Sequence, residues 1–417
     1  MKKSLLVLTD ALPPAFAPRM AFLLDALSQK GYKITAFSIR QPGCCNLSTG
    51  NAIAHKFDYN PSFLRAIKLV AEACLGYKDR WFYHQIKPYI QGKAFDAVLC
   101  STYDTFPLPT ALKIAKQLHI PLIADLRDIT EQFGTHYFKN RHPRAPWLGK
   151  WFASIKLNVR NNVIKQAQAV VSVSPWHVQF LREKVLDRVS GTSTGSVTDT
   201  KPNIHLIYNG YDAIKFHFKP ISSNKFNIVY TGRLVDLAIQ DPTLLFKALD
   251  QCLACQSLKK EDINLHFYTD NDSKQRIQQT LLPHPLLHPL IHYHNMVPAQ
   301  QVPTLLWESS VVLVLSNKQT TDGPKGIMTT KFFEALGVEK PVLCVKSDEA
   351  CLASAIAKTN AGIAATHVEE VKAFILEKYA QWQQNGYTHQ NVVVAEKEKF
   401  SRQSMAQQFE NAILSVL

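Results

Sequence analysis

The sequence predicts an α/β protein with two doubly wound domains, each built on a parallel sheet. Short and almost continuously apolar runs recur along the chain, helical patterns separate them, and the same rhythm repeats in the second half of the 417 residues. Apolar runs of this kind are typical of parallel strands covered on both faces. The composition, 46% apolar and 19% charged, excludes a globally disordered chain.

Six runs in the first half are predicted to be strands. They are Leu5–Thr9, Ile34–Ile39, Ala97–Ser101, Pro121–Leu126, Ala169–Val173 and His205–Tyr208. A helix is expected after the first of them, because Met20, Leu23, Leu24 and Leu27 follow helical spacing and Gly31 can end the helix. The apolar start of the chain stops at Thr9, so we interpret it as a buried strand rather than a signal peptide.

The second half repeats this pattern. Its expected strands are Phe226–Thr231, Ile263–Thr269, Leu290–His294, Val311–Leu315, Pro341–Val345 and Gly362–Ala365. Helices are expected near Thr243–Cys252, Val302–Trp307, Thr329–Leu336 and Val368–Trp382. The polar segment Ser190–Pro202 is expected to be an exposed loop within the first domain. We therefore expect domains at 1–217 and 218–398, and a final helix at 399–417.

The positive charge lies in the first half of the chain. Residues 1–190 contain 26 basic residues (Lys and Arg) against 12 acidic residues (Asp and Glu). The remaining residues contain 21 basic and 21 acidic residues. The first domain is therefore expected to attract an anionic partner such as a phosphate-bearing substrate or an acidic lipid surface. Nucleic acid is not expected, because no nucleic-acid-binding motif accompanies the charge. No apolar run reaches the ~18 residues of a membrane span, so a cytoplasmic protein is expected.

Ligands of open parallel sheets bind beyond the carboxyl ends of the strands. In the first domain, these positions hold Pro14, Arg19, Asp125, Arg127 and Asp128. Arg19 lies in the first turn of a helix, where the dipole disfavours a cation, so a role in clamping an anion is one interpretation and a solvated side chain is the other. For the three charged residues after the fourth strand, the alternative is an ion-pair network that holds neighbouring loops.

In the second domain, the corresponding positions hold two groups of residues. Gly232 and Arg233 follow the first strand, and Gly326 precedes a helix whose first turns carry Lys331 and Glu334. A guanidinium binds a diphosphate through two parallel hydrogen bonds. Lys331 and Glu334 are three residues apart and share a helix face, so a surface ion pair is the alternative to a ligand site.

We expect no metal and no cofactor. Asp270-Asn271-Asp272 matches an Asp-x-Asp metal motif, but its position before a helical pattern favours capping. Prolines interrupt the histidines from His284 to His294, and Cys252-x-x-Cys255 has no second pair at zinc spacing. No phosphate loop or dinucleotide fingerprint is present, which argues against a kinase or a dehydrogenase.

Taken in order, several motifs resemble those of family-4 retaining glycosyltransferases with the GT-B fold. They are Pro13-Pro14 with Arg19 and Gly31-Tyr32, Asp125-Leu126-Arg127-Asp128, Val171–Ser174, Asn209–Asp212, Tyr230–Arg233, Asp241-Pro242, Lys331–Glu334 and Lys340–Val342. The final helix resembles the one that returns to the first domain in this family. The chain departs from the family at Ala15, Phe16 and Ala17, where the family has glycines, and at Gly326, where it has a first glutamate.

The resemblance implies a retaining, metal-independent glycosyltransferase of cell-surface polysaccharide biosynthesis. Its donor would be a UDP- or GDP-linked sugar bound by Gly232, Arg233, Gly326, Lys331 and Glu334. Its acceptor, a saccharide or a lipid-linked saccharide, would meet the residues named for the first domain. Arg233, Lys331 and Asp128 would be the catalytic residues.

Two other functions remain open at this point. A binding or scaffold protein could have kept the fold and lost catalysis, and the missing glutamate and glycines support it. A sugar-nucleotide 2-epimerase shares the architecture, and the basic first domain argues against it.

Basic and aromatic residues also gather in the first half, at Arg80–Lys87 and between Tyr137 and Phe152. They predict attachment to the inner face of the cytoplasmic membrane, with packing in the core as the alternative.

Overall fold

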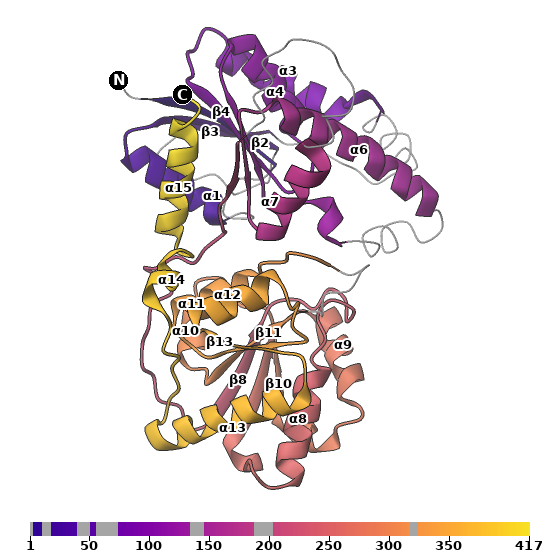
Figure 1. The fold of residues 1–417 in the computed structure, drawn as a ribbon, viewed down its shortest axis with the longest axis vertical. Helices are drawn as coiled ribbons and strands as arrows, with labels where there is room; N and C mark the ends of the chain where they lie inside the picture. Colours follow the sequence, from indigo (N-terminus) through magenta and orange to yellow (C-terminus); the bar gives the residue numbers. More distant parts are fainter. Residues whose placement is uncertain are drawn as a thin grey trace. The chain divides into compact units, whose positions relative to one another are not determined.

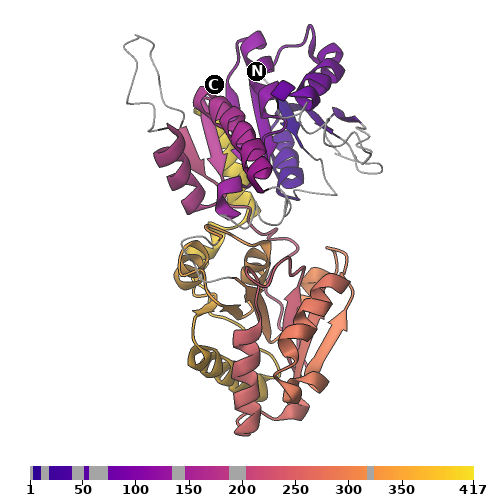
Figure 2. The same cartoon turned by 90° about the vertical axis from the view of Figure 1, so that its right-hand side faces the viewer.

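The computed structural model describes residues 3–10, 18–39, 51–55, 74–133, 146–186, 203–316 and 324–417, with the backbone alone for 51–55, 146–150 and 152. Two compact units make up the chain. Unit 1 contains residues 1–208 and 405–417, and unit 2 contains residues 209–404. Each unit has a parallel sheet with helices on both faces (Figures 1 and 2). The α/β class with two doubly wound domains is therefore confirmed.

The sheet of unit 1 has seven parallel strands in the order β3-β2-β1-β4-β5-β6-β7. They are β1 (Ser4–Thr9), β2 (Lys33–Ile39), β3 (Asn51–His55), β4 (Ala97–Thr102), β5 (Leu122–Leu126), β6 (Ala169–Ser172) and β7 (Asn203–Leu206). The central β1 has Leu5, Leu6, Val7 and Leu8 fully buried, which confirms its interpretation as a buried strand. The prediction missed β3, which lies at the edge of the sheet and has only three apolar residues, Ala52 to Ala54.

The side chains of β1 alternate between two cores. Leu5 and Val7 point to the core beneath α1 (Pro18–Gln29) and α15 (Arg402–Leu414), while Leu6 and Leu8 point to the opposite core. That second core lies beneath α3 (Tyr77–Ile90), α4 (Leu108–Leu118), α6 (Pro146–Gln166) and α7 (Pro175–Leu181). Figure 1 shows α15 beside α1, so the last helix completes unit 1 although it follows unit 2 in sequence.

The sheet of unit 2 has six parallel strands in the order β10-β9-β8-β11-β12-β13. They are β8 (Phe226–Thr231), β9 (Ile263–Tyr268), β10 (Ile291–His294), β11 (Val311–Leu315), β12 (Val342–Val345) and β13 (Gly362–Ala365). All six were predicted within one residue at each end. In both sheets the order reverses beside the first strand, at β1–β4 and at β8–β11.

Two layers of helices cover this sheet. The helices α8 (Thr243–Ala254) and α13 (Val368–Asn385) pack on the face that presents Phe226, Ile228 and Tyr230. The other helices of the unit are α9 (Asn271–Leu281), α10 (Val302–Trp307), α11 (Thr330–Gly337), α12 (Cys351–Thr359) and α14 (Val394–Glu398). The prediction missed α12, although its buried Leu352, Ala355, Ile356 and Thr359 follow helical spacing.

Two segments of unit 2 that are far apart in sequence run side by side. The amide of Tyr211 donates to the carbonyl of Phe400 at 2.9 Å, and the amide of Arg402 donates to the carbonyl of Tyr211 at 2.8 Å. Gly210 has a φ of +67°, and a Cβ there would lie 2.8 Å from the Phe400 oxygen. The close approach therefore requires glycine at this position.

Candidate functional site

The candidate donor site lies in unit 2, at the carboxyl ends of β8 and β11. The strand order reverses there, and polar loops follow both strands. The first loop carries Gly232 and Arg233. The second leads through Gly326, which has a φ of +66°, into α11 with Lys331 and Glu334. The structure thus brings together Gly232, Arg233, Lys331 and Glu334 within one unit, and Gly326 lies in the loop that leads into α11.

Lys331 crosses directly over Gly232. A Cβ on Gly232 would lie 2.7 Å from Cε and 2.8 Å from Nζ of Lys331, and Gly232 has a φ of +120°. The ammonium group lies 5.3 Å from the centroid of the Tyr230 ring, and the Tyr230 hydroxyl donates to the carbonyl of Arg233 at 2.8 Å. The missing side chain of Gly232 therefore leaves the space in which the cation lies at the end of β8.

Burial shifts both charged groups of α11 toward neutrality. It lowers the pKa of Lys331, against the attraction of Glu334. It raises the pKa of Glu334 to about 7, although Lys331 and Arg402 favour the ionised carboxylate. Arg402 lies in the first turn of α15, 3.8 Å from the Asp212 carboxylate. An anionic ligand beside Lys331 would raise its pKa again and favour the charged ammonium group.

The Arg233 side chain extends into solvent, and an ion pair holds its Nε in place. Its side chain is 65% exposed, and its Nε lies 3.1 Å from Asp270 Oδ2. Within the described residues, no hydrogen bond or ion pair involves its two terminal nitrogens. Asp270 also accepts from the amide of Ser273 at 2.9 Å and from its hydroxyl at 2.5 Å, which caps α9. The capping interpretation of Asp270 is confirmed, and the same carboxylate orients Arg233.

The histidines of the predicted 284–294 segment take up different positions. His292 and His294 lie on β10 beside His266 of β9, and His266 Nδ1 is 3.0 Å from His294 Nε2. Over the described parts of the chain, no group of three or more His, Cys, Asp or Glu is arranged to hold a metal ion. His284 instead lies 3.4 Å from Asp250.

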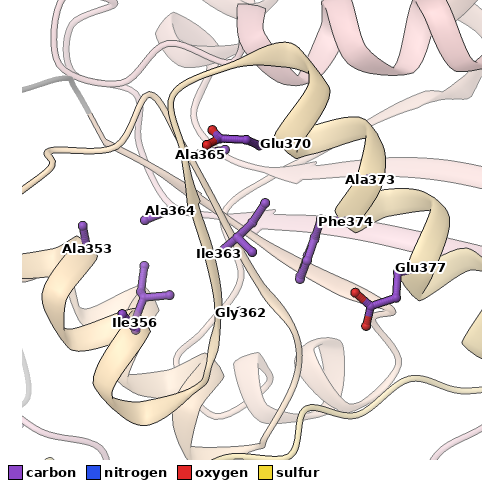
Figure 3. A pocket seen from close by; sticks show the side chains of 11 residues that line it. Ala353, Ile356, Gly362, Ile363, Ala364, Ala365, Glu370, Ala373, Phe374 and Glu377 are labelled. Atoms are coloured by element: carbon purple, nitrogen blue, oxygen red, sulfur yellow. The ribbon is translucent and has the colours of Figure 1, made fainter.

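A separate cavity of about 580 Å³ lies along the edge strand β13 (Figure 3). Small and apolar side chains of α12 and β13 line it, and α13 contributes Glu370, Phe374 and Glu377. Glu370 accepts hydrogen bonds from the amides of Thr366 and His367 and thereby caps α13. Because the cavity has no free cation and does not include the ends of β8 and β11, we do not assign the donor to it.

In unit 1, Arg19 and Asp125 form a buried ion pair. Arg19 Nη2 lies 2.5 Å from Asp125 Oδ1, and the side chains are 3% and 0% exposed. Ser101 donates its hydroxyl to Asp125 Oδ2 at 2.6 Å, and the Arg19 guanidinium lies 5.1 Å from the ring of Phe409 in α15. The ion-pair alternative of the sequence analysis therefore describes Asp125, whereas the solvated side chain that was the alternative for Arg19 is wrong, because Arg19 is buried against Asp125.

Arg127 and Asp128 follow β5 and differ from that pair. Arg127 forms an ion pair with Asp10, which follows β1, and its guanidinium lies 5.8 Å from the Tyr103 ring. Asp128 is exposed and accepts a hydrogen bond from Gln132 Nε2 at 3.0 Å. Pro14 lies outside the described residues. Asp128 is therefore the predicted acceptor-side residue whose carboxylate reaches the surface.

Three residues of these sites, Gln132, His177 and Arg402, were not assigned a role from the sequence, and the contact of Asp270 with Arg233 was not expected. Gln132 and His177 lie behind Asp128, Asp270 holds Arg233, and Arg402 lies near Glu334. Gln132 and His177 carry no motif. Arg402 does carry a signal in the sequence, because it is a cation in the first turn of a helix, as Arg19 is.

We expect the protein to lose stability on mild acidification because of His177. Burial, and then Arg160, lowers the pKa of His177 to about 4, whereas an unfolded histidine titrates near 6.5. The unfolded chain therefore binds the proton first, so the contribution of His177 is complete above pH 6.5 and is lost as the pH falls toward 4. Urea unfolding at pH 7.5 and pH 5 should differ by about 2 kcal/mol from this residue. An equally large pH effect in His177→Gln would contradict this assignment.

The fold defines the class of the protein. Two parallel sheets, each with the order that reverses beside its first strand, give the GT-B fold. No family model and no curated protein matches the sequence. Solved structures match over nearly the whole chain. Sucrose-phosphate synthase from Thermosynechococcus elongatus is 13% identical, with a TM-score of 0.64 and coverage of 98% of each chain.

Two further structures are similar to this chain. HepE from Anabaena, in complex with UDP and glucose, is 14% identical, with a TM-score of 0.60 over 99% of this chain and 100% of that one. A UDP-forming α,α-trehalose-phosphate synthase from Burkholderia xenovorans is 14% identical, with a TM-score of 0.62 over 100% and 99%. At these identities, the similarity shows the shared fold.

Proposed function

We propose that this protein is a retaining glycosyltransferase that moves a sugar from a nucleoside-diphosphate sugar to a saccharide or a lipid-linked saccharide. One observation carries the proposal: Lys331 lies over Gly232 at the switch point of unit 2, next to the partly free guanidinium of Arg233. Two cations at this edge of a parallel sheet suit a diphosphate. The HepE complex with UDP and glucose, a protein of the same fold, supports a nucleotide-sugar donor.

In the proposed reaction, the bond between the anomeric carbon and the diphosphate breaks, and the acceptor oxygen attacks from the same face. The acceptor proton passes to the departing phosphate, so no nucleophilic carboxylate is needed. Arg233 and Lys331 stabilise the charge that develops on the diphosphate, which is the main catalytic contribution. Glu334 binds the ribose hydroxyls, and its raised pKa makes it a hydrogen-bond donor or acceptor near neutrality.

The experiment that tests this function is a panel of nucleotide sugars incubated with the purified protein. Binding of one donor, its hydrolysis without acceptor and transfer to saccharide acceptors support a transferase. Interconversion of the donor at C2 without an acceptor would identify an epimerase. Tight donor binding without turnover, with any acceptor, would leave the binding or scaffold protein, which the glycine at position 326 favours.

We expect transfer to continue in EDTA, because Arg233, Lys331 and helix termini meet the phosphate charge in this proposal. Asp272→Ala is the appropriate test of the Asp-x-Asp motif, since Asp270 also caps α9 and orients Arg233. Its transfer rate should stay within about twofold of the wild type, as for a surface substitution. A strict requirement for Mn²⁺ or Mg²⁺, together with the loss of transfer in Asp272→Ala, would contradict the proposal.

We also propose that the basic first half attaches the enzyme to an anionic membrane surface in cell-surface polysaccharide synthesis. Among the described aromatics of this half, Phe82 and Tyr83 pack in the core, which corrects their predicted surface role. Tyr77, Tyr103 and Trp151 are 57%, 55% and 47% exposed and support the proposal. In the described part of the chain, no helix has the length and apolarity of a transmembrane span.

Flotation with anionic and neutral vesicles tests this attachment. Binding is expected to anionic vesicles alone, and high salt should release it. Reversing the charges of Arg141, Arg144 and Lys150 should reduce it by roughly 100-fold or more, at about 1 kcal/mol per basic residue. The side chains of these three lie outside the described residues. Binding that is unchanged in the triple variant would contradict the proposal.

A further inference from the structure

A chain of hydrogen bonds leads from the exposed carboxylate of Asp128 into the core of unit 1. Gln132 Nε2 donates to Asp128 Oδ1 at 3.0 Å, and Gln132 Oε1 lies 2.7 Å from His177 Nε2. His177 Nδ1 lies 3.2 Å from the Ser172 hydroxyl, which is also 3.1 Å from the carbonyl of Leu126. The chain thus joins the end of β5 to the end of β6 and the start of α7.

The chemistry of the groups gives this chain one direction. An ionised carboxylate only accepts, so the amide nitrogen of Gln132 must face Asp128 and its oxygen must face His177. His177 therefore carries its proton on Nε2, and its Nδ1 shares the single hydroxyl proton of Ser172 with the carbonyl of Leu126. The imidazole stays neutral at physiological pH, because burial lowers its pKa to about 4. The Gln132 amide is thus held in one orientation between the Asp128 carboxylate and a buried, neutral histidine.

The turn that carries Gln132 is also held by a second contact, which does not involve His177. Gln132 lies in the short helix Thr130–Phe133, and it is 2% exposed, while His177 is 1% exposed. In the same turn, Glu131 accepts two hydrogen bonds from Arg160 of α6, at 2.7 and 2.8 Å. The Arg160 pair anchors the turn, whereas the Gln132 amide reaches the surface carboxylate. The two neighbouring residues therefore have separable roles.

We propose that Asp128 is the residue of unit 1 that binds the reacting hydroxyl of the acceptor, and that Gln132 and His177 are positioning residues that hold it for this contact. This inference rests on the proposed function. Among the described residues, no hydrogen bond involves Asp128 Oδ2, which leaves this oxygen to accept from a sugar hydroxyl. The charges that face Asp128 are Arg127, Arg19 and Asp10, and Arg160 faces His177.

Two matched substitutions separate positioning from anchoring, Gln132→Glu and Glu131→Gln. The first replaces the donating amide by a second carboxylate, which raises the pKa of Asp128. The acid limb of the pH profile of kcat/KM for acceptor should then move up by about one pH unit or more. Glu131→Gln should lower the thermal midpoint and leave the acid limb in place. Asp128→Asn should reduce transfer by about 10- to 100-fold with unchanged UDP binding.

The result that overturns the inference is an unmoved acid limb in Gln132→Glu, or equal shifts in both variants. A readout that needs no substrate is the tautomer of His177 in ¹⁵N-labelled protein. The Nε2–H form is expected from pH 5 to pH 8, and an Nδ1–H form would refute the chain. If the wild type consumes no nucleotide sugar, the proposed function fails together with the acceptor contact. If the wild type transfers sugar but the acid limb in Gln132→Glu or the His177 tautomer differs from the expected result, only the present inference fails.

Discussion

Lys331→Met and Arg233→Ala should each lower transfer by roughly 30- to 1,000-fold, which corresponds to about 2–4 kcal/mol of transition-state stabilisation. Methionine keeps the length of the lysine side chain and removes the charge from the space above Gly232. The loss should appear in kcat and in the affinity for nucleoside diphosphate, because the diphosphate charge is present before reaction and grows as the bond breaks.

Lys331→Arg should not restore activity. Lys331 already fills the space that the missing side chain of Gly232 leaves, and a planar guanidinium is wider than an ammonium group. Steady-state kinetics and calorimetric titration with UDP measure both effects. Lys358→Ala is the matched control, since Lys358 is an exposed cation of α12. Normal donor affinity and rate in both Lys331→Met and Arg233→Ala would refute the donor site.

The second large effect is expected at Asp125. Asp125→Ala should destabilise unit 1 by about 3–5 kcal/mol, because it leaves the Arg19 cation buried without its carboxylate. The double variant Arg19→Met with Asp125→Ala should recover part of this loss, since the unpaired charge is removed as well. Urea unfolding followed by circular dichroism gives both values.

Glu369→Gln provides the comparison for an exposed pair. Glu369 is 77% exposed and lies 3.0 Å from Lys372, so its loss should cost less than about 1 kcal/mol. If Asp125→Ala lowers the free energy of unfolding by no more than Glu369→Gln does and also greatly lowers transfer, the structural role of Asp125 is contradicted. This result would return Asp125 to the acceptor contacts that the sequence analysis expected.

The fold was predictable because its signals are local. Each central strand is a continuous apolar run, and Leu5–Thr9 and Val311–Leu315 are typical. The positions that we propose for the donor were predictable for a related reason, since the carboxyl ends of parallel strands meet at one edge and Gly232 and Lys331 follow such ends. The weak signals belong to β3 at an edge, with few apolar residues, and to α12, whose first turn follows a charged loop.

The acceptor side was less predictable because charge pairing depends on distance in space. Arg19 and Asp125 are 106 positions apart, and Arg127 and Asp10 are 117 apart. No local pattern indicates which carboxylate neutralises which cation. Gln132 and His177 were missed for the same reason, since a buried amide and a neutral histidine differ from core residues only by their partners. The role of Asp270 required knowing that Arg233 lies beside it.

The return of α15 to unit 1 has a consequence for synthesis of the chain on the ribosome. Met405, Phe409 and Ile413 supply one side of the core beneath Leu5 and Val7, and the Phe409 ring covers the Arg19 guanidinium. The amino-terminal unit therefore cannot finish folding when its own first two hundred residues have emerged. Although α1 covers part of this sheet face, the part beneath α15 stays uncovered until unit 2 has been translated. During that interval, this part of the sheet is exposed apolar surface, which favours aggregation of the nascent chain.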